Sequence, residues 1–394
     1  MTPPAHAHSD LHASQQRWRD ERRYLNEHRH DLAQLARQLY SDIPQVQGLL
    51  TSDGWIPPAP IPLDEVHLGW DTDPPSPRIT GAEPPSATVR PLASSAGTFP
   101  TYSAAMAQLA PPTTFENRPC YGLTGITTTA AAPQLTFSTA TYFDVIDVAE
   151  AVAHELAQAA QDTGQRLPSE GRLPFRRSIG DPRDLAARTV VPAASVLTIR
   201  RSSTDGPTML LHRRDSTKVA HGGGLYQVVP VGVFQPTSPT QANWTNDFDL
   251  WRFITREYDE ELLGAPENTS NEPLDYDAWP FYQALQKAIQ NGSLQVFWLG
   301  LGMDPLSLVT DILVAAVFDQ PVFDELFQHL VETNAEGDIV GVATSSAGTV
   351  GIPFTQAAVD HFTGTQPMQA AGAALLDLAW RHRATLVGSV MPTV

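Results

Sequence analysis

The residues best suited to chemistry are three glutamates in the segment Arg-Glu-Tyr-Asp-Glu-Glu-Leu-Leu-Gly, which ends at residue 264. At about 100° per residue, Glu257, Glu260 and Glu261 share one face of a helix. Carboxylates held this close repel one another unless a cation lies among them, and Mg²⁺ takes oxygen ligands and bridges to phosphates. The spacing therefore predicts that these glutamates bind Mg²⁺ and that Arg256 holds one carboxylate by a forked hydrogen bond.

Candidate substrate-binding residues lie upstream of the glutamates. They are Arg213, Arg214, Lys218, His221, Gly223 and Tyr226. The cations would balance charge on a phosphoryl group, and the glycines that follow His221 let a backbone approach a ligand closely. The same loop resembles the oxyanion loop of lipases, but the Gly-x-Ser-x-Gly motif that those enzymes need is absent from the sequence. A simple turn between strands is the remaining interpretation of this loop.

A helix over 247–263 must carry the glutamates, because acidic residues begin it and Gly264-Ala265-Pro266 ends it. The apolar run 305–317 fits either a buried strand or a helix. Asp311 within it could cap an element or line a pocket, but a core position is favoured. The flanking pattern predicts strands or helices at 193–200, 208–214, 225–234, 280–290, 293–300 and 366–387. Together these elements predict an α+β fold with mixed sheets.

The first half of the chain has a less regular pattern. Residues 13–40 carry apolar residues at helical spacing with charges between them, which predicts one polar helix. The segment 57–100 holds 11 of the 34 prolines, so we expect an extended linker or wrap there. A strand is expected at 134–143, followed by a helix at 144–161 with Asp144 as its N-cap.

The segment that ends at Gly264 resembles the second half of the Nudix box, a pattern that ends in Arg-Glu, any two residues, Glu-Glu and then glycine. A Nudix domain places this helix after two or three strands and a glycine-containing loop, and residues 193–234 supply such a region. Leu210-Leu211 before His212 looks like the strand that runs into a phosphate-facing arginine. The resemblance covers about residues 190–335 and implies a Nudix-like mixed sheet flanked by helices.

On this basis we divide the chain into five segments. They are an N-terminal helical segment (1–50), a proline-rich linker or wrap (51–100), an α/β extension that packs on the core (101–190), the Nudix-like domain (191–335) and a C-terminal helical extension (336–394).

The resemblance implies a Mg²⁺-dependent hydrolase, or a related enzyme, that acts on a nucleotide-type or other phosphorylated small molecule. The first half of the box is altered, because Ala242 and Phe248 stand at its glycine and glutamate positions, and Gly264 falls one residue late. The pattern from His212 to Gly264 is also similar to an actinobacterial family of Nudix-like proteins that are often labelled as regulators. A non-catalytic Nudix-like sensor or regulatory module that binds a small molecule is therefore the alternative, and whether the chain is an enzyme stays open.

The overall charge narrows the range of partners. With 25 Lys and Arg against 43 Asp and Glu, the formal net charge is −18, which disfavours nucleic acids and acidic membranes as partners. The single cysteine, Cys120, excludes an internal disulfide, and no apolar run approaches about 18 residues. We therefore expect a cytoplasmic protein with a small-molecule ligand, and a homodimer through the helix at 13–40 is an open alternative.

Overall fold

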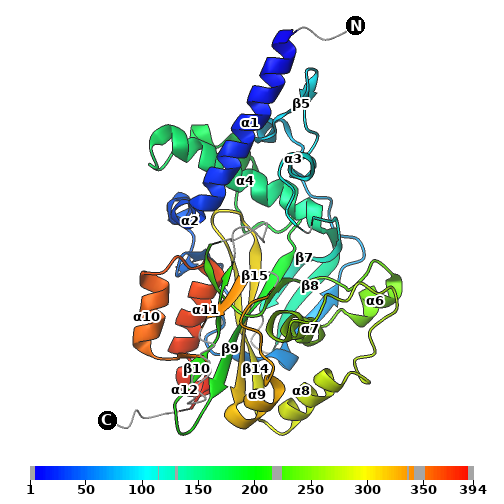
Figure 1. The fold of residues 1–394 in the computed structure, drawn as a ribbon, viewed down its shortest axis with the longest axis vertical. Coiled ribbons are helices and arrows are strands. Elements are labelled where there is room, and N and C mark those ends of the chain that lie inside the picture. The colour runs from blue at the N-terminus through cyan, green and yellow to red at the C-terminus, as the bar shows by residue number, and fades with distance from the viewer. Residues whose placement is uncertain are drawn as a thin grey trace.

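A mixed β-sheet occupies the centre of the computed structural model, which describes residues 5–113, 115–128, 132–214, 224–334, 337–340 and 351–388 (Figure 1). Its long strands are β9 (Pro192–Arg201), β14 (Leu294–Met303) and β15 (Thr310–Asp319). Strand β15 runs parallel to β9 and antiparallel to β14. Shorter strands extend this sheet: β1 (Gln45–Val46), β2 (Leu49–Leu50), β3 (Ile61–Pro62), β10 (Thr208–Met209), β13 (Val231–Val233) and β17 (Ile352–Pro353).

Smaller sheets flank the central one. One contains β11 (Leu211–Arg214), β12 (Tyr226–Val228) and β16 (Gly337–Val340). Another contains β4 (His67–Trp70), β7 (Pro119–Thr128) and β8 (Pro133–Thr141), and a hairpin pairs β5 (Leu92–Ser94) with β6 (Gly97–Thr98). The predicted α+β class, with a mixed sheet flanked by helices, is confirmed.

Helices surround the sheets. The first half of the chain contains α1 (Ala5–Glu27), α2 (Arg29–Ala36), α3 (Tyr102–Leu109), α4 (Tyr142–Thr163) and α5 (Pro174–Ile179). The second half contains α6 (Gln241–Asn246), α7 (Leu250–Leu263), α8 (Pro280–Gln290), α9 (Gln320–Leu326), α10 (Gln356–Gly364), α11 (Ala370–Arg381) and α12 (Arg383–Leu386). Short 3₁₀ turns are η1 (Arg37–Tyr40), η2 (Leu63–Glu65), η3 (Pro84–Val89) and η4 (Glu170–Arg172).

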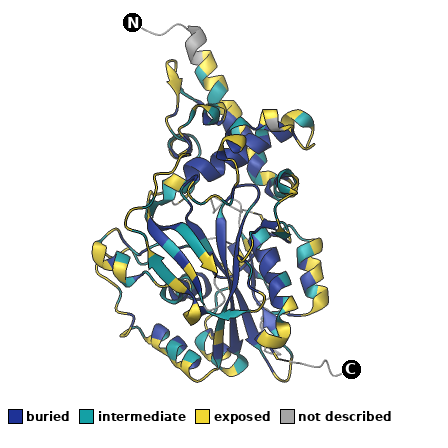
Figure 2. Cartoon of the chain, turned by 180° about the vertical axis from the view of Figure 1, so that it is seen from behind, coloured by how far each residue is buried: buried dark blue, intermediate teal, exposed yellow. Residues whose placement is uncertain are grey.

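The central sheet is buried on both faces. Along β15, Val314 and Phe318 pack in the cluster that contains α7, whereas Leu313 and Val317 pack in the cluster that contains α11. This double burial explains why the run 305–317 showed no alternation that would separate a strand from a helix. Figure 2 shows the same contrast, with buried strands inside and exposed outer faces on the peripheral helices.

Helix α7, which carries the three glutamates, ends at Gly264 as predicted, where the backbone adopts a left-handed conformation with φ of 72°. It begins at Leu250 rather than 247, because the side chain of Asp249 accepts the backbone N–H of Arg252 and caps the helix. One face of α7 buries Ile254, Tyr258 and neighbouring residues, and this burial holds the helix against the sheet.

Two predicted helix boundaries in the first half are wrong. The helix expected over 13–40 is broken at His28, so that Arg22 from α1 and Arg29 from α2 both reach the buried carboxylate of Glu150. Helix α4 begins at Tyr142, because Thr141 and Asp144 form a reciprocal capping box in which Asp144 is the third helical residue and not the cap.

The proline-rich segment lies against the body of the molecule. Its Val89 carbonyl accepts a hydrogen bond from the indole of Trp18 on α1, and β4 pairs in parallel with β8. Among the residues that the structure describes, no helix combines the length and apolar character that a membrane crossing requires.

Candidate functional site

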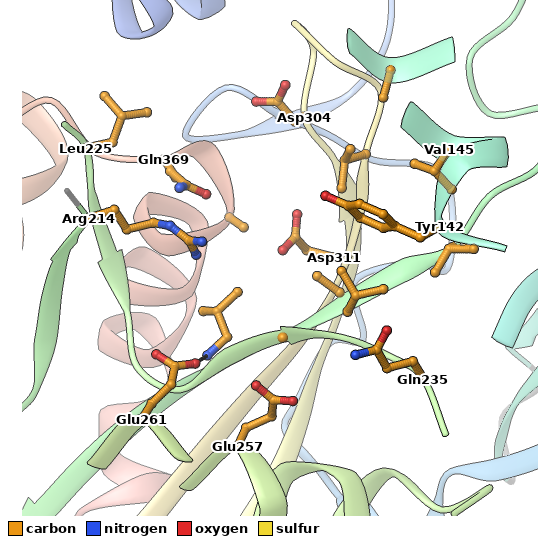
Figure 3. A pocket seen from close by; sticks show the side chains of 18 of the residues that line it. Tyr142, Val145, Arg214, Leu225, Gln235, Glu257, Glu261, Asp304, Asp311 and Gln369 are labelled. Carbon is orange, nitrogen blue, oxygen red and sulfur yellow. Dashed lines mark hydrogen bonds between the residues drawn. The ribbon is translucent and has the colours of Figure 1, made fainter. Parts of the chain in front are cut away.

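A cavity of about 770 Å³ lies at the amino-terminal ends of β9 and β15 (Figure 3). Residues of α2 and α4 bound it on one side, and residues of β13, α7 and the start of α11 bound it on the other. On α4, the lining residues Tyr142, Val145, Ile146 and Ala149 recur at helical spacing, so one face of that helix forms the wall. The cavity therefore combines elements from distant parts of the chain.

All three predicted glutamates line this cavity. Glu261 is 6% exposed, and its Oε1 accepts the backbone N–H of Val231 at 2.7 Å while its Oε2 lies 3.7 Å from Nδ1 of His212. The carboxylate of Glu257 packs closely against Gly232, so a Cβ atom at position 232 would clash with that carboxylate. The two glutamates thus fix α7 against β13.

Glu260 lies at a different part of the wall. Its pKa is raised to about 7, mainly by burial and also by the neighbouring carboxylate of Glu267. The positive charges of Arg256 and Arg118 oppose this rise. Arg118 forms ion pairs with Glu267 and Glu116. Across the described ranges, no group of three or more His, Cys, Asp or Glu side chains lies close enough together to hold a metal ion. The glutamates therefore face one cavity without forming a preassembled three-ligand metal site.

Arg256 was predicted to hold a carboxylate, but its hydrogen bond goes to a backbone carbonyl. Its Nη2 donates to the backbone carbonyl of Gln235 at 2.7 Å, and its guanidinium lies 5.5 Å from the centre of the Phe253 ring. Gln235 lies in the loop that follows β13. Arg256 therefore donates to this loop and not, as the sequence had predicted, to a carboxylate. Arg256 consequently fixes the loop that follows β13, and it acts on Glu260 through its charge.

The upstream residues divide between two faces of their strand. Arg214 lines the cavity, whereas Arg213 is exposed and its guanidinium lies 5.9 Å from the centre of the Tyr226 ring. Because side chains alternate along a strand, only His212 and Arg214 of this strand point toward the α7 side. Tyr226 packs edge-on against Phe362 and does not line the cavity. Lys218, His221 and Gly223 lie outside the described residues.

The sequence analysis did not identify several polar residues of the wall. Figure 3 shows Tyr142, Gln235, Gln369, Asp304 and Asp311 directed toward the same space as Arg214. Asp311 is an isolated aspartate inside an apolar run, and its position in the wall matches the less favoured of its two interpretations, lining a pocket. The remaining four residues carried no such signal.

Asp311 is the most buried of these polar residues, at 7% exposed. It pairs with Ala193 in the parallel register of β15 and β9, and Ser195 lies on the same face and donates its hydroxyl to Oδ1 at 2.8 Å. The pKa of Asp311 is raised to about 7, mainly by burial. The charge of Asp304 acts in the same direction, and the hydrogen bond from Ser195 and the charge of Arg214 oppose the rise.

The lining is strongly acidic. Its charged residues among those described are Arg29, Arg118, Arg214, Glu116, Glu150, Glu257, Glu260, Glu261, Glu267, Asp304 and Asp311. Arg29 pairs with Glu150, and Arg118 pairs with Glu116 and Glu267. Arg214 is the third arginine of the described lining, in which eight carboxyl groups accompany three arginines.

Comparisons with known proteins give limited information. No protein-family model matches the chain, and no curated protein sequence matches it. Among solved structures, the chain is similar to a Nudix hydrolase from Alicyclobacillus acidocaldarius, with 19% sequence identity and a TM-score of 0.26. The similarity covers 52% of this chain and 98% of that one. A likeness of this size does not show that the chain belongs to that family.

Proposed function

We propose that this chain is a small-molecule-binding protein whose ligand occupies the cavity between α4, β13, α7 and α11. The observation that carries the proposal is the cavity itself, about 770 Å³ in volume and lined by both apolar and charged side chains. Ligand sites of small molecules typically have this size and a few convergent polar groups. Buried carboxyl groups that face an internal space also need a ligand or solvent to satisfy them.

The contacts of α7 support binding more directly than turnover. One oxygen of Glu261 accepts a backbone N–H, and the carboxylate of Glu257 packs against Gly232. Arg256 donates to a loop carbonyl. These residues hold β13 and its loop in position as a wall of the cavity. Such anchoring would be retained in a protein that binds its ligand and releases it unchanged.

A cavity-filling variant tests this proposal. Ala193 lines the cavity beside Asp311, so Ala193→Phe places a ring in the space, whereas Ala96→Phe makes the same change in the exposed turn between β5 and β6. We expect a thermal-shift screen of small molecules to yield compounds that stabilise the wild type and Ala96→Phe but not Ala193→Phe. Hits that stabilise Ala193→Phe equally, or no hits at all, would contradict the proposal.

Metal-dependent hydrolysis of a phosphorylated small molecule is a second candidate, favoured by the convergence of Glu257, Glu260 and Glu261 on a cavity that also contains Arg214. Mg²⁺ usually binds proteins through one or two carboxylates plus substrate phosphates, so Glu257 and Glu261 are the residues that would hold it. A bound Mg²⁺ would polarise a phosphoryl oxygen. Arg214 would bind the phosphate and orient it.

Phosphate release separates the two candidates. If hydrolysis is the function, nucleotides or polyphosphates incubated with Mg²⁺ should yield phosphate or a nucleoside monophosphate with the wild type, and the double variant Glu257→Gln/Glu261→Gln should yield none. Binding of ligands without release of phosphate, in the presence and absence of Mg²⁺, would leave small-molecule binding as the function.

A further inference from the structure

Asp311 differs from the glutamates of α7 in how its carboxyl group is partnered. Oδ1 accepts the hydroxyl of Ser195, whereas Oδ2 has no hydrogen-bond partner among the residues described. Figure 3 shows the group directed into the cavity that Tyr142 and Asp304 also line. Asp304 is close enough for its charge to act on Asp311. A side chain that is 7% exposed and keeps one oxygen toward an internal space leaves a strong acceptor for a ligand.

The charges around Asp311 determine which ligand suits this acceptor. Asp304 faces it from the loop before β15, and Glu257 faces the same space from α7. The charge of Arg214 favours the ionised form of Asp311 but does not outweigh burial, because the pKa remains near 7. Among the described residues, Arg214 is the one cation that acts on Asp311, and the like charge of Asp304 opposes it, so a cationic ligand would relieve the repulsion between the two carboxyl groups.

We infer that the ligand of this cavity carries a positively charged amine or amidine nitrogen that donates to Asp311. This inference rests on the proposal that the cavity is the binding site, and it names the chemical class of ligand. A planar amidinium matches a carboxylate with parallel N–H groups, and the ring of Tyr142 provides an aromatic surface for the apolar part of such a molecule.

An organic cation fits better than a metal ion at this position. Asp311 does not join two further His, Cys, Asp or Glu side chains in any metal-binding group of the described ranges. Ser195 donates a hydrogen to the carboxylate and supplies no negative charge. The apolar lining residues Val191, Ile146 and Val309 suit the carbon skeleton of an organic ligand.

Benzamidine and benzamide are nearly identical in shape and differ in charge, so they test the inference directly. We expect calorimetric titration at pH 8 to show that benzamidine binds the wild type and that benzamide binds at least about tenfold more weakly. Asp311→Asn should lose at least about tenfold in benzamidine affinity. Asp42→Asn, an identical change at an exposed site, should bind like the wild type. MgCl₂ alone should not compete with benzamidine.

Several results would overturn the inference. These are equal binding of benzamide and benzamidine, unchanged affinity in Asp311→Asn, or no binding of benzamidine to the wild type. If the broader screen then yields a neutral or anionic ligand that Ala193→Phe does not bind, the cavity proposal stands and the inference about charge falls alone. If no compound depends on residue 193, both fall.

Ser195→Ala provides a second variant if Asp311→Asn does not fold. Loss of the hydroxyl donor disfavours ionised Asp311, so benzamidine affinity should fall at pH 7 and recover at pH 9. A purely structural effect of the substitution would lower the affinity equally at both pH values, and that result would contradict the inference.

Discussion

The carboxylate of Glu261 accepts the backbone N–H of Val231 at 2.7 Å, which joins helix α7 to strand β13 inside the protein. Glu261, the last of the three glutamates predicted to bind Mg²⁺, therefore also has a structural role. Because β13 pairs with β9, this one hydrogen bond connects the acidic helix to the sheet that carries both Ser195 and Asp311.

Removal of this acceptor should destabilise the protein. Glu261→Ala leaves the partly buried N–H of Val231 without its partner and should lower the free energy of unfolding by about 1–3 kcal/mol. Glu261→Gln keeps an oxygen that can accept the bond and should lose less. Urea unfolding measures both, with Glu260→Ala as the control, because Glu260 makes no hydrogen bond to the described residues. Equal losses in all three variants would show that the bond to Val231 is unimportant.

Gly232 and Glu257 should show strong energetic coupling. A Cβ atom at position 232 would clash with the carboxylate of Glu257, so Gly232→Ala should displace that side chain and destabilise the fold by about 1–2 kcal/mol. In a Glu257→Ala background the same substitution has room and should cost much less. A double-mutant cycle by urea unfolding measures the difference, and additive losses would contradict the contact.

Asp311 should make stability depend on pH. The pKa of Asp311 is raised to about 7 in the folded protein, mainly by burial and also by Asp304, while Ser195 and Arg214 oppose the rise. The folded state therefore keeps a proton that the unfolded chain releases near pH 4. Stability from this group is present below pH 4 and is lost as the pH rises toward 7. Asp311→Asn does not titrate. Relative to the wild type, it should therefore gain on the order of 2 kcal/mol between pH 5 and pH 8.

Unfolding of both proteins in urea at the two pH values provides the measurement. A constant difference between Asp311→Asn and the wild type would mean that the pKa of Asp311 is ordinary in the folded state. Asp42→Asn, the same substitution at an exposed site, is the matched control.

The loop that carries Asp304 should depend on a buried arginine. The guanidinium of Arg176, from α5, donates to the carbonyls of Pro305 and Leu306 and to the hydroxyl of Tyr40. Arg176→Met should lower the free energy of unfolding by about 2 kcal/mol or more and speed hydrogen exchange in residues 304–309. Arg183→Met removes a partly exposed arginine that pairs with Asp181 at the surface, and it should change stability by less than about 0.5 kcal/mol. Unaltered exchange in the loop of Arg176→Met would contradict this role.

The sequence predicted the elements better than it predicted the site. Helix α7 followed from amphipathic spacing and the stop at Gly264, and the glutamates do line one cavity. Strand alternation already implied that Arg213 and Arg214 face opposite sides, although both were proposed as ligand-binding residues.

The rest of the cavity depends on tertiary packing. Tyr142 begins a helix in the first half, and Asp311 lies in a strand that is buried on both faces. Neither residue has a local pattern that indicates a shared cavity, because their proximity arises only when α4 packs across the ends of β9 and β15. The bond of Arg256 to Gln235 depends in the same way on where the loop after β13 lies.

The most direct test of this account is a crystal structure of the protein grown with benzamidine at saturating concentration. We predict density for the probe inside the cavity, with its nitrogens about 3 Å from the carboxylate of Asp311 and its ring beside Tyr142. Density for the probe elsewhere on the protein, with the cavity free of it, would contradict the central claim.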